Sequence, residues 1–183
     1  MPYGVRSHWT RIAMYEAAKK HFEGDAGKLD VVEISGGAFS DLLPWKSFRS
    51  VSGVDLCKDG WQFRAKDANL IVIDQVLEHV DSPHEALVNI VKALPAGGRV
   101  FVSTPFLVKN HPSPQDHWRW TSSGLALMLK RAAFKDVHSD SWGNRACAIA
   151  NFALWETYRP ADHSLVNEPD FPVTVWAWGT KVG

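Results

Sequence analysis

The sequence predicts an α/β fold with a mainly parallel, twisted sheet and helices on both of its faces. Short β-branched runs alternate with helical segments along most of the chain, which is typical of strands joined by helical crossovers. Several of these runs end in acidic or small residues, as strands that border a ligand site often do. A length of 183 residues suits one domain, so we expect residues 1–183 to form a single unit.

The first half of the chain is expected to begin with a helix and to continue with three strands. Apolar side chains recur near a 3.6-residue period over residues 8–22, so we expect a helix there, within an N-terminal helical cap over residues 1–27. Leu29–Ile34 is a β-branched run bounded by glycines and predicts a buried strand. Ser50–Val54 and Asn69–Asp74 predict two further strands on the same grounds.

A capping box opens the second half. Ser82-Pro83-His84-Glu85 places a serine before a proline at the first helical position, and it predicts a helix that runs to Leu94. The polar, Pro-rich loop over residues 105–121 is longer than a usual connection, which makes it a candidate for function. The other expected elements are a strand at Arg99–Thr104, a helix from Ser122 or Ser123 to Ala133, and strands at Phe134–Ser139 and Val173–Trp178.

Composition excludes several classes of partner. Twenty Lys and Arg residues balance 20 Asp and Glu residues without a long basic run, which disfavours nucleic acid and anionic membranes as partners. Cys57 and Cys147 lie far apart and form no C-x-x-C pair, so neither a disulfide framework nor a thiolate zinc site is expected. No apolar run approaches the roughly 18 residues of a membrane span. We expect a cytoplasmic protein that acts on a small molecule, and the pattern leaves its oligomeric state open.

The expected strand ends carry the residues of interest, because ligands of open parallel sheets bind beyond the carboxyl ends of the strands. These ends are Glu33 to Gly37, Asp55, Asp74-Gln75 and Thr104-Pro105. Asp55 lies 18 residues after Gly37, close to the spacing at which an acidic residue accepts hydrogen bonds from ribose hydroxyls. This spacing predicts an adenosine-type cofactor.

The glycine loop after the first strand discriminates between adenosine cofactors. Dinucleotide binding needs G-x-G-x-x-G, and the corresponding positions are Ser35, Gly37 and Ser40, which give one match of three. S-adenosylmethionine carries no phosphate, so its loop needs close backbone approach without the full triplet. Pro44 also limits any helix after the loop that could offer its dipole to phosphates. NAD is therefore disfavoured and S-adenosylmethionine is favoured.

Four segments together resemble the class I S-adenosylmethionine-dependent methyltransferases, in particular small members of the methyltransferase-11 type. They are Val31–Gly37 (motif I), Val54-Asp55-Leu56, Ile71–Val80 with its Val-Leu-Glu-His string, and Leu94–Val102 with Leu-Pro-x-Gly-Gly. The resemblance also includes the last strand pair and covers most of the chain in the right order. It implies a Rossmann-like fold with S-adenosylmethionine as the cofactor.

The resemblance also implies which residues hold the cofactor. Glu33 and the turn Ser35-Gly36-Gly37 would hold its methionine end, and Asp74 and Gln75 would line the methionine and sulfonium side. Asp55 would accept hydrogen bonds from the ribose hydroxyls, with Leu56 against the adenine. Ser35 stands where the family has the first glycine of motif I.

The segment after Asp55 departs from the family's pattern because it is short. It leaves little room for the third strand that the resemblance implies. We therefore expect an abbreviated third strand, with Trp61-Gln62-Phe63 as its remnant.

Residues 111–120 form the densest polar and aromatic stretch of the chain, and we interpret the loop as a substrate loop. Methyl transfer from a sulfonium requires an aligned acceptor and, when the acceptor is a hydroxyl, removal of a proton. His111 or His117 could be that base with Asp116 to orient it, and Arg119 suits a carboxylate or phosphate on the acceptor. A metal ion is not expected, because the two histidines and Asp116 have no further identifiable ligand.

Three features have a structural interpretation beside the functional one. In the substrate loop, Trp118 and Trp120 could simply cover the edge of the sheet while Arg119 pairs with an acid. Glu78 and His79 are expected to be a polar pair that orders the connection to the Ser82 cap rather than a catalytic pair. Ser141–Arg145 could close the pocket or form a turn in which Asn144 makes local hydrogen bonds.

The function that the sequence favours is S-adenosylmethionine-dependent methylation of a small polar acceptor, such as O-methylation of a sugar or secondary metabolite. The fourth strand of the family's order ends in Asp74-Gln75-Val76 rather than in an acid or amide followed by two prolines and an aromatic residue, so methylation of a nucleobase is not expected. The alternatives are a non-catalytic cofactor-binding or partner subunit and an NAD-dependent oxidoreductase.

Overall fold

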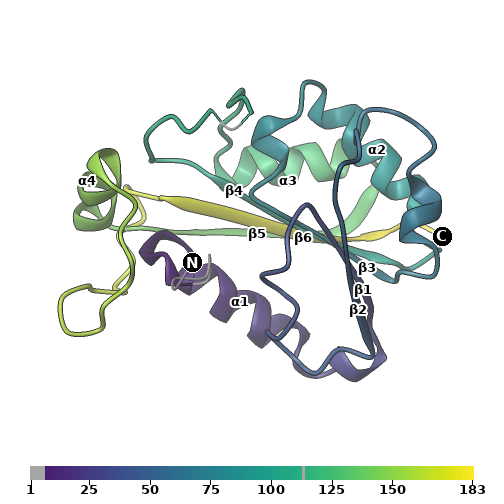
Figure 1. Ribbon diagram of the computed structural model, residues 1–183, viewed down its shortest axis with the longest axis horizontal. Coiled ribbons are helices and arrows are strands. Elements are labelled where there is room, and N and C mark those ends of the chain that lie inside the picture. The colour runs from purple at the N-terminus through teal and green to yellow at the C-terminus, as the bar shows by residue number, and fades with distance from the viewer. Residues whose placement is uncertain (1–6, 113) are drawn as a thin grey trace.

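The computed structural model describes residues 7–112 and 114–183, and its centre is a six-stranded sheet with the strand order β2-β1-β3-β4-β6-β5 (Figure 1). The strands are β1 (Asp30–Ile34), β2 (Ser47–Val51), β3 (Leu70–Asp74), β4 (Arg99–Pro105), β5 (Phe134–Trp142) and β6 (Thr174–Lys181). The first four strands are parallel, and β6 is antiparallel to both of its neighbours. The first six residues of the expected N-terminal cap and Ser113 of the expected substrate loop lie outside the described residues.

The strand order reverses next to β1. From β1 the chain passes outward to β2 and then returns to the other side of β1, where it adds β3 and β4. The carboxyl ends of β1 and β3 therefore flank the topological switch point, where ligands of such sheets bind. The residues expected at the strand ends consequently lie along one edge of the sheet.

Helices cover both faces of the sheet. The helix α1 (Ile12–Phe22), preceded by the 3-10 helix η2 (Trp9–Arg11), lies on one face, and α2 (Pro83–Ala93) and α3 (Ser122–Arg131) lie on the other (Figure 1). The helix α4 (Arg145–Ala153), which the sequence analysis did not expect, lies at one end of the sheet and contacts η2. The predicted α/β, Rossmann-like fold is confirmed.

Alternating side chains of β3 anchor two apolar clusters. Ile71 and Ile73 belong to the cluster under α2 and α3, whereas Leu70 and Val72 belong to the cluster under α1. All four side chains are fully buried. A central parallel strand that is buried on both faces has a continuous apolar sequence, and this is why β3 could be recognised from sequence.

The prediction for β2 is wrong by three residues. The strand runs over Ser47–Val51 instead of Ser50–Val54, and it pairs with β1 from Asp30 opposite Ser47 to Ile34 opposite Val51. As an edge strand, β2 carries mostly polar, exposed residues, so its apolar pattern is weak. Asp55 consequently follows the strand after a short turn instead of standing directly at its end.

The expected remnant of a third strand is wrong as well. Among the described residues between β2 and β3 there is no strand, and Trp61 instead precedes the 3-10 helix η4 (Gln62–Ala65). The side chains of Trp61 and Ala65 are buried in the cluster that includes α2, while Phe63 is exposed. This segment therefore spans the distance from β2 to β3 in a 3-10 turn that packs on the helical layer.

The helix caps differ in part from the expected ones. Ser82 precedes Pro83 as predicted, but its side chain makes no capping hydrogen bond, so the capping box is wrong. The cap of α3 is Thr121 rather than Ser122 or Ser123, and its hydroxyl accepts a hydrogen bond of 3.1 Å from the amide of Gly124. Asn144 caps α4 by accepting from the amide of Cys147 at 2.8 Å, which is the local hydrogen bonding expected for this residue.

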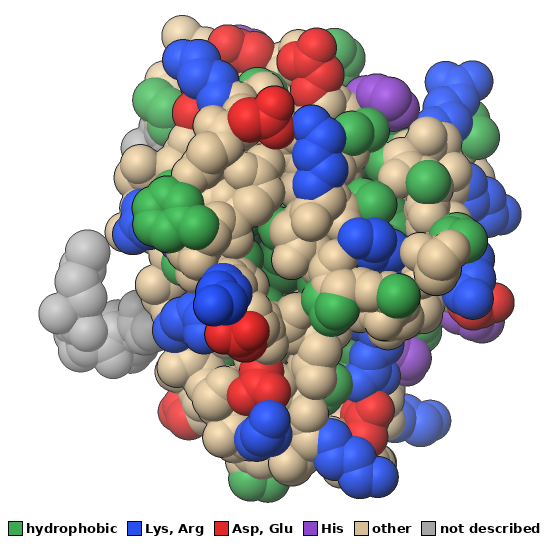
Figure 2. All heavy atoms as spheres, turned by 90° about the vertical axis from the view of Figure 1, so that its right-hand side faces the viewer, with side chains coloured by type: hydrophobic (Ala, Val, Ile, Leu, Met, Phe, Trp, Pro, Cys, Tyr) green, Lys and Arg blue, Asp and Glu red, His purple; other side chains and the backbone are tan. Residues whose placement is uncertain are grey.

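Charges of both signs lie on the face of the molecule that Figure 2 shows. Figure 2 shows one face of the molecule, on which Lys and Arg side chains alternate with Asp and Glu side chains and small apolar patches. Within the described part of the chain, no helix combines the length and apolar character needed to cross a membrane.

The two caps give a matched stability test. Thr121→Ala removes a capping hydrogen bond and should lower the free energy of unfolding by about 1 kcal/mol. Ser82→Ala removes a hydroxyl that caps nothing, and should change it by less than about 0.5 kcal/mol. Urea unfolding of both variants measures the difference, and an equal loss in the two would contradict the cap assignment.

Candidate active site

The loop after β1 is organised by a buried carboxylate. Glu33, at the carboxyl end of β1, is only 1% exposed and accepts hydrogen bonds from the amides of Ala38 at 3.1 Å and Phe39 at 3.0 Å. Burial raises the pKa of Glu33 to about 7, although these amides favour the charged form. A Cβ at Gly36 would lie 2.2 Å from the Glu33 carboxylate, so the loop can close over this side chain only because residue 36 is glycine.

A cavity of about 260 Å³ opens beside this loop. Ser35, which has a φ of 59°, turns the backbone at its rim, and Asp55 lies opposite on the turn after β2. The Asp55 carboxylate is half exposed, lies 3.1 Å from Nζ of Lys58 and accepts from the amide of Cys57 at 3.0 Å. Its hydrogen bond with Lys58 lowers the pKa of Asp55. We name this the nucleoside cavity, after the part of the cofactor that the sequence predicts at Asp55; its lining is Ile34, Ser35, Val54, Asp55, Leu56, Cys57, Val76, His79, Val80 and Asp81.

A buried polar network lies at the carboxyl end of β3. Asp74 accepts hydrogen bonds from the hydroxyl of Tyr15 at 2.6 Å and from the hydroxyl of Ser103, and it lies 3.7 Å from the guanidinium of Arg11. Burial and the neighbouring Asp74 charge raise the pKa of Tyr15 above its usual range. The side-chain amide of Gln75, whose φ is 55°, donates to Ser103 at 3.2 Å. Asp74 is therefore bonded to its own protein neighbours.

A second cavity, of about 430 Å³, lies on the other side of Gln75. Its polar groups come from η2, β6 and the loop after β4, and its apolar wall includes Trp155. We name it the acceptor cavity, after the predicted substrate loop that borders it; its lining is His8, Thr10, Arg11, Gln75, Pro105, Val108, His111, Pro112, Trp155, Val173 and Thr174. Because Gln75 lines this cavity and Val76 lines the nucleoside cavity, the two cavities adjoin across one peptide bond.

The expected substrate loop supplies four residues to the acceptor cavity, Pro105, Val108, His111 and Pro112, of which His111 is the titratable one. His111 lies in its wall, and burial lowers the pKa of this histidine. Asp116 holds the loop by accepting from the amide of His111 at 2.9 Å and by a two-pronged ion pair with Arg119, whose second hydrogen bond is 2.6 Å. The hydrogen bond from Arg119 lowers the pKa of Asp116 to about 2. Arg119 is thus engaged with Asp116 within the loop.

Other predicted residues lie elsewhere. His117 lines neither cavity; its ring lies 3.2 Å from the exposed Asp81, and its amide donates to the carbonyl of Glu78 at 2.8 Å. Of the eight residues expected to hold the cofactor, Ser35, Asp55 and Leu56 line the nucleoside cavity and Gln75 lines the acceptor cavity. Glu33, Gly36, Gly37 and Asp74 line neither cavity; Glu33 and Asp74 are bonded within the protein, and Gly36 lies against the Glu33 carboxylate.

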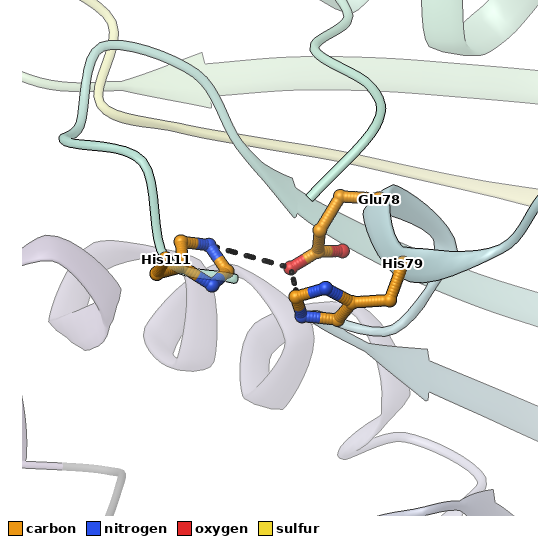
Figure 3. Close-up of side chains that lie close together, drawn as sticks. All are labelled: Glu78, His79 and His111. Carbon is orange, nitrogen blue, oxygen red and sulfur yellow. Dashed lines mark ion pairs between the residues drawn. The ribbon is translucent and has the colours of Figure 1, made fainter. Parts of the chain in front are cut away.

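Glu78 is a site residue that the sequence analysis assigned to another role. It lies on the 3-10 helix η5 (Leu77–His79), its side chain is 0% exposed, and neither carboxylate oxygen has a hydrogen-bond partner among the described residues. Its carboxylate points at the rings of His79 and His111 (Figure 3). Burial raises the pKa of Glu78 to about 8. The expected role of Glu78 in ordering the Ser82 connection is wrong, because its side chain forms no bond to that segment; a charged residue in the apolar string Val76–Val80 was the available signal.

Comparison with known proteins identifies the family. Residues 8–145 match the model of a methyltransferase domain family. Among curated proteins, no match to the chain is found. The chain is similar in structure to a chain of the complex that contains the Trm112 methyltransferase activator of Haloferax volcanii, with 13% identity, a TM-score of 0.60, and coverage of 97% of this chain and 90% of that one.

Two further solved structures have the same fold. A SAM-dependent methyltransferase from Archaeoglobus fulgidus is 11% identical with a TM-score of 0.58, and the match covers 93% of this chain and 94% of that one. An S-adenosylmethionine-dependent methyltransferase from Mesorhizobium loti is 15% identical with a TM-score of 0.57, and the match covers 90% and 96%. At such identities these structures show a shared fold.

The chain belongs to this methyltransferase domain family, because the family model matches most of its length. The prediction of a class I S-adenosylmethionine-dependent methyltransferase is confirmed.

The buried Glu33 predicts a specific pH dependence of stability. Its pKa of about 7 in the folded state exceeds the value near 4.5 that it has when unfolded. Its contribution should therefore be fully present below about pH 4.5, should decline by up to about 3 kcal/mol as the pH rises to about 7, and should then level off. Glu33→Gln should remove this decline, and unfolding of both proteins between pH 5 and 8 measures it. Parallel stability curves would contradict the raised pKa.

Proposed function

We propose that this protein transfers the methyl group of S-adenosylmethionine to an oxygen atom of a small polar acceptor, such as a sugar or a secondary metabolite. The observation that carries the proposal is the pair of adjoining cavities at the carboxyl ends of β1, β3 and β4. Membership of the methyltransferase family supports the reaction class. The class of acceptor rests on the chemistry of the second cavity.

The nucleoside cavity fits the adenosine half of S-adenosylmethionine. Asp55 offers a partly exposed carboxylate to the ribose hydroxyls, and Leu56 with Val76 and Val80 offers an apolar wall to the adenine. The cofactor supplies an electrophilic methyl group on a sulfonium. Because Glu33 and Asp74 are bonded within the protein, the backbone of the turn after Ser35 and the side chain of Gln75 are the groups that would hold the methionine end.

The acceptor cavity fits a small molecule with hydroxyl groups. Thr10, Gln75 and Thr174 contribute polar groups to its wall, and Trp155 offers a flat apolar surface. Such a mixture suits a sugar or another compact polar metabolite. Arg11 adds a guanidinium to the same wall, so a negative group on the acceptor would also be accommodated.

His111 is the residue that we place against the reacting hydroxyl. Its ring lies in the wall of the acceptor cavity, next to His79 of the nucleoside cavity, at a distance of 5.0 Å between ring centroids. Asp116 and Arg119 act as positioning residues, because Asp116 accepts from the amide of His111, lies 4.0 Å from Nε2 of its ring and is itself held by Arg119. In-line methyl transfer depends mainly on such alignment.

The remaining sequence predictions belong to the same proposal. A cytoplasmic location, action as a single domain over residues 1–183, and small-molecule rather than nucleic-acid acceptors follow from composition and charge.

A non-catalytic role as a cofactor-binding or partner subunit is the alternative. It would be supported if the protein bound S-adenosylmethionine and a broad panel of acceptors gave no S-adenosylhomocysteine.

Asp55→Ala tests the cofactor half of the site. The variant should bind S-adenosylmethionine roughly tenfold more weakly, since charge-assisted hydrogen bonds to the ribose hydroxyls are lost. Asp59→Ala, which removes an exposed carboxylate of the same segment that pairs with Lys92 at 3.0 Å, is the matched control and should leave affinity unchanged. Titration calorimetry gives both dissociation constants. Unchanged binding by Asp55→Ala would remove this residue from the site.

The two histidines of the substrate loop make a second test. His111→Ala should reduce kcat by about a hundredfold or more while the affinity for S-adenosylmethionine is kept, because the ring faces the acceptor. His117→Ala should reduce kcat less than about tenfold, because its ring lies outside both cavities. The readout is formation of S-adenosylhomocysteine with a panel of sugars and hydroxylated metabolites. A larger effect of His117→Ala would restore that residue as the candidate base.

A further inference from the structure

Glu78, His79 and His111 bring three metal-ligating atoms together at the junction of the two cavities. Oε1 of Glu78 lies 3.6 Å from Nε2 of His79 and 3.9 Å from Nε2 of His111, and all three atoms lie within 4.8 Å of one another. Figure 3 shows both rings turned toward the same carboxylate oxygen. Separations of 3.6 and 3.9 Å are too long for hydrogen bonds.

The carboxylate of Glu78 is deeply buried. Its side chain is 0% exposed, and neither of its oxygens has a hydrogen-bond partner among the described residues. Within the described ranges, its close contacts are with Nε2 of His79 and Nε2 of His111, and the charges of Arg11 and Arg119 also act on it. With its raised pKa, the buried Glu78 holds a proton near neutral pH, and a cation bound between the three side chains would replace that proton.

The second nitrogen of His79 fixes the ring for ligation. Nδ1 of His79 is hydrogen-bonded to the backbone carbonyl of Gln115, which can only accept, so Nδ1 carries the proton. Nε2 then has a free lone pair that points toward Glu78. Histidines that bind metals commonly donate their other ring nitrogen to a carbonyl in this way.

The separations agree with the size of a first-row divalent ion. Bonds of about 2.0 to 2.2 Å to nitrogen and oxygen put the ligands of a tetrahedral Zn²⁺ about 3.4 Å apart. The separations of 3.6 and 3.9 Å from Glu78 exceed this value by a few tenths of an ångström, and the two histidine atoms, within 4.8 Å of each other, would have to move together as the ion binds. Two imidazoles and one carboxylate favour Zn²⁺ or Co²⁺ over Mg²⁺ or Ca²⁺, which prefer oxygen ligands.

We propose that Glu78, His79 and His111 bind one Zn²⁺ ion between the nucleoside and acceptor cavities. Three protein ligands leave a fourth position open, as in catalytic zinc sites. His111 lies in the wall of the acceptor cavity, so the ion would border that cavity. With the ion bound, His111 would serve as a ligand in place of the base, and the ion would lower the pKa of an acceptor hydroxyl; this consequence rests on the proposed methyl transfer, whereas the ion site does not.

This site departs from the expectation of no metal. Within the substrate loop itself no complete ligand set is present, because Asp116 pairs with Arg119. The fold supplies the missing ligands from η5, which lies across the cavity junction from the loop.

The test uses the full chain without a histidine tag, stripped of metal with a chelator and titrated with Zn²⁺ by calorimetry. We expect one ion per chain, and binding weaker by at least about a hundredfold in Glu78→Gln and in His111→Ala. His117→Ala is the matched control, because it removes a histidine of the same loop that also pairs with a carboxylate, and it should bind as the unmodified protein does. Thermal unfolding verifies that each variant is folded.

Co²⁺ titration gives a readout that needs no variant. Ligation by two imidazoles and a carboxylate in four-coordinate geometry should produce visible absorption bands that Zn²⁺ abolishes by displacement. Absence of binding by either ion, or binding that His117→Ala abolishes while Glu78→Gln does not, would overturn the site. If the protein binds S-adenosylmethionine but neither metal ion, the proposed Zn²⁺ site is wrong while the proposed methyl transfer is unaffected. The failure of one proposal can therefore be distinguished from the failure of the other.

Discussion

The site depends on the buried carboxylate of Asp74 at the end of β3. This side chain accepts hydrogen bonds from Tyr15 of α1 and Ser103 of β4, and it attracts the guanidinium of Arg11 on η2. It therefore joins the helix on one face of the sheet to two central strands at the switch point. The buried carboxylate of Asp74 is tolerated there because three partners interact with it. Removal of any one partner would leave the carboxylate less compensated in a low-dielectric environment.

The residues that follow Asp74 are held in position by this network. Gln75 turns with a positive φ while its amide is held by Ser103, and the next residues form η5 between the two cavities. This order places Val76 beside the nucleoside cavity and Gln75 beside the acceptor cavity. It also aims Glu78 at two histidines, one of them from a loop more than thirty residues further along. A rigid strand end thus aligns groups from distant parts of the sequence, as in-line transfer requires.

The parts of the fold that sequence predicts well are those with a strong local signal. β3 is apolar on both faces, and α2 combines a helical apolar period with Pro83 at its first position. β2 was misplaced because an edge strand needs few apolar residues. Asp55 and Ser35 could be predicted because strand ends and spacing locate them. The cluster of Glu78, His79 and His111 could not be predicted, since its members come together only through tertiary packing. His117 looked equivalent to His111 in sequence, and only the path of the loop separates their environments.

The measurement that tests the central claim most directly is thermal unfolding with S-adenosylmethionine, S-adenosylhomocysteine and NAD in parallel. Ligand at about 100 times its dissociation constant adds roughly 2.7 kcal/mol of stability, which corresponds to a rise in Tm of about 5 to 11 °C for a chain of this size. A rise with the two sulfur ligands and none with NAD is the predicted result. No shift with either sulfur ligand, or an equal shift with NAD, would contradict the assignment of the nucleoside cavity.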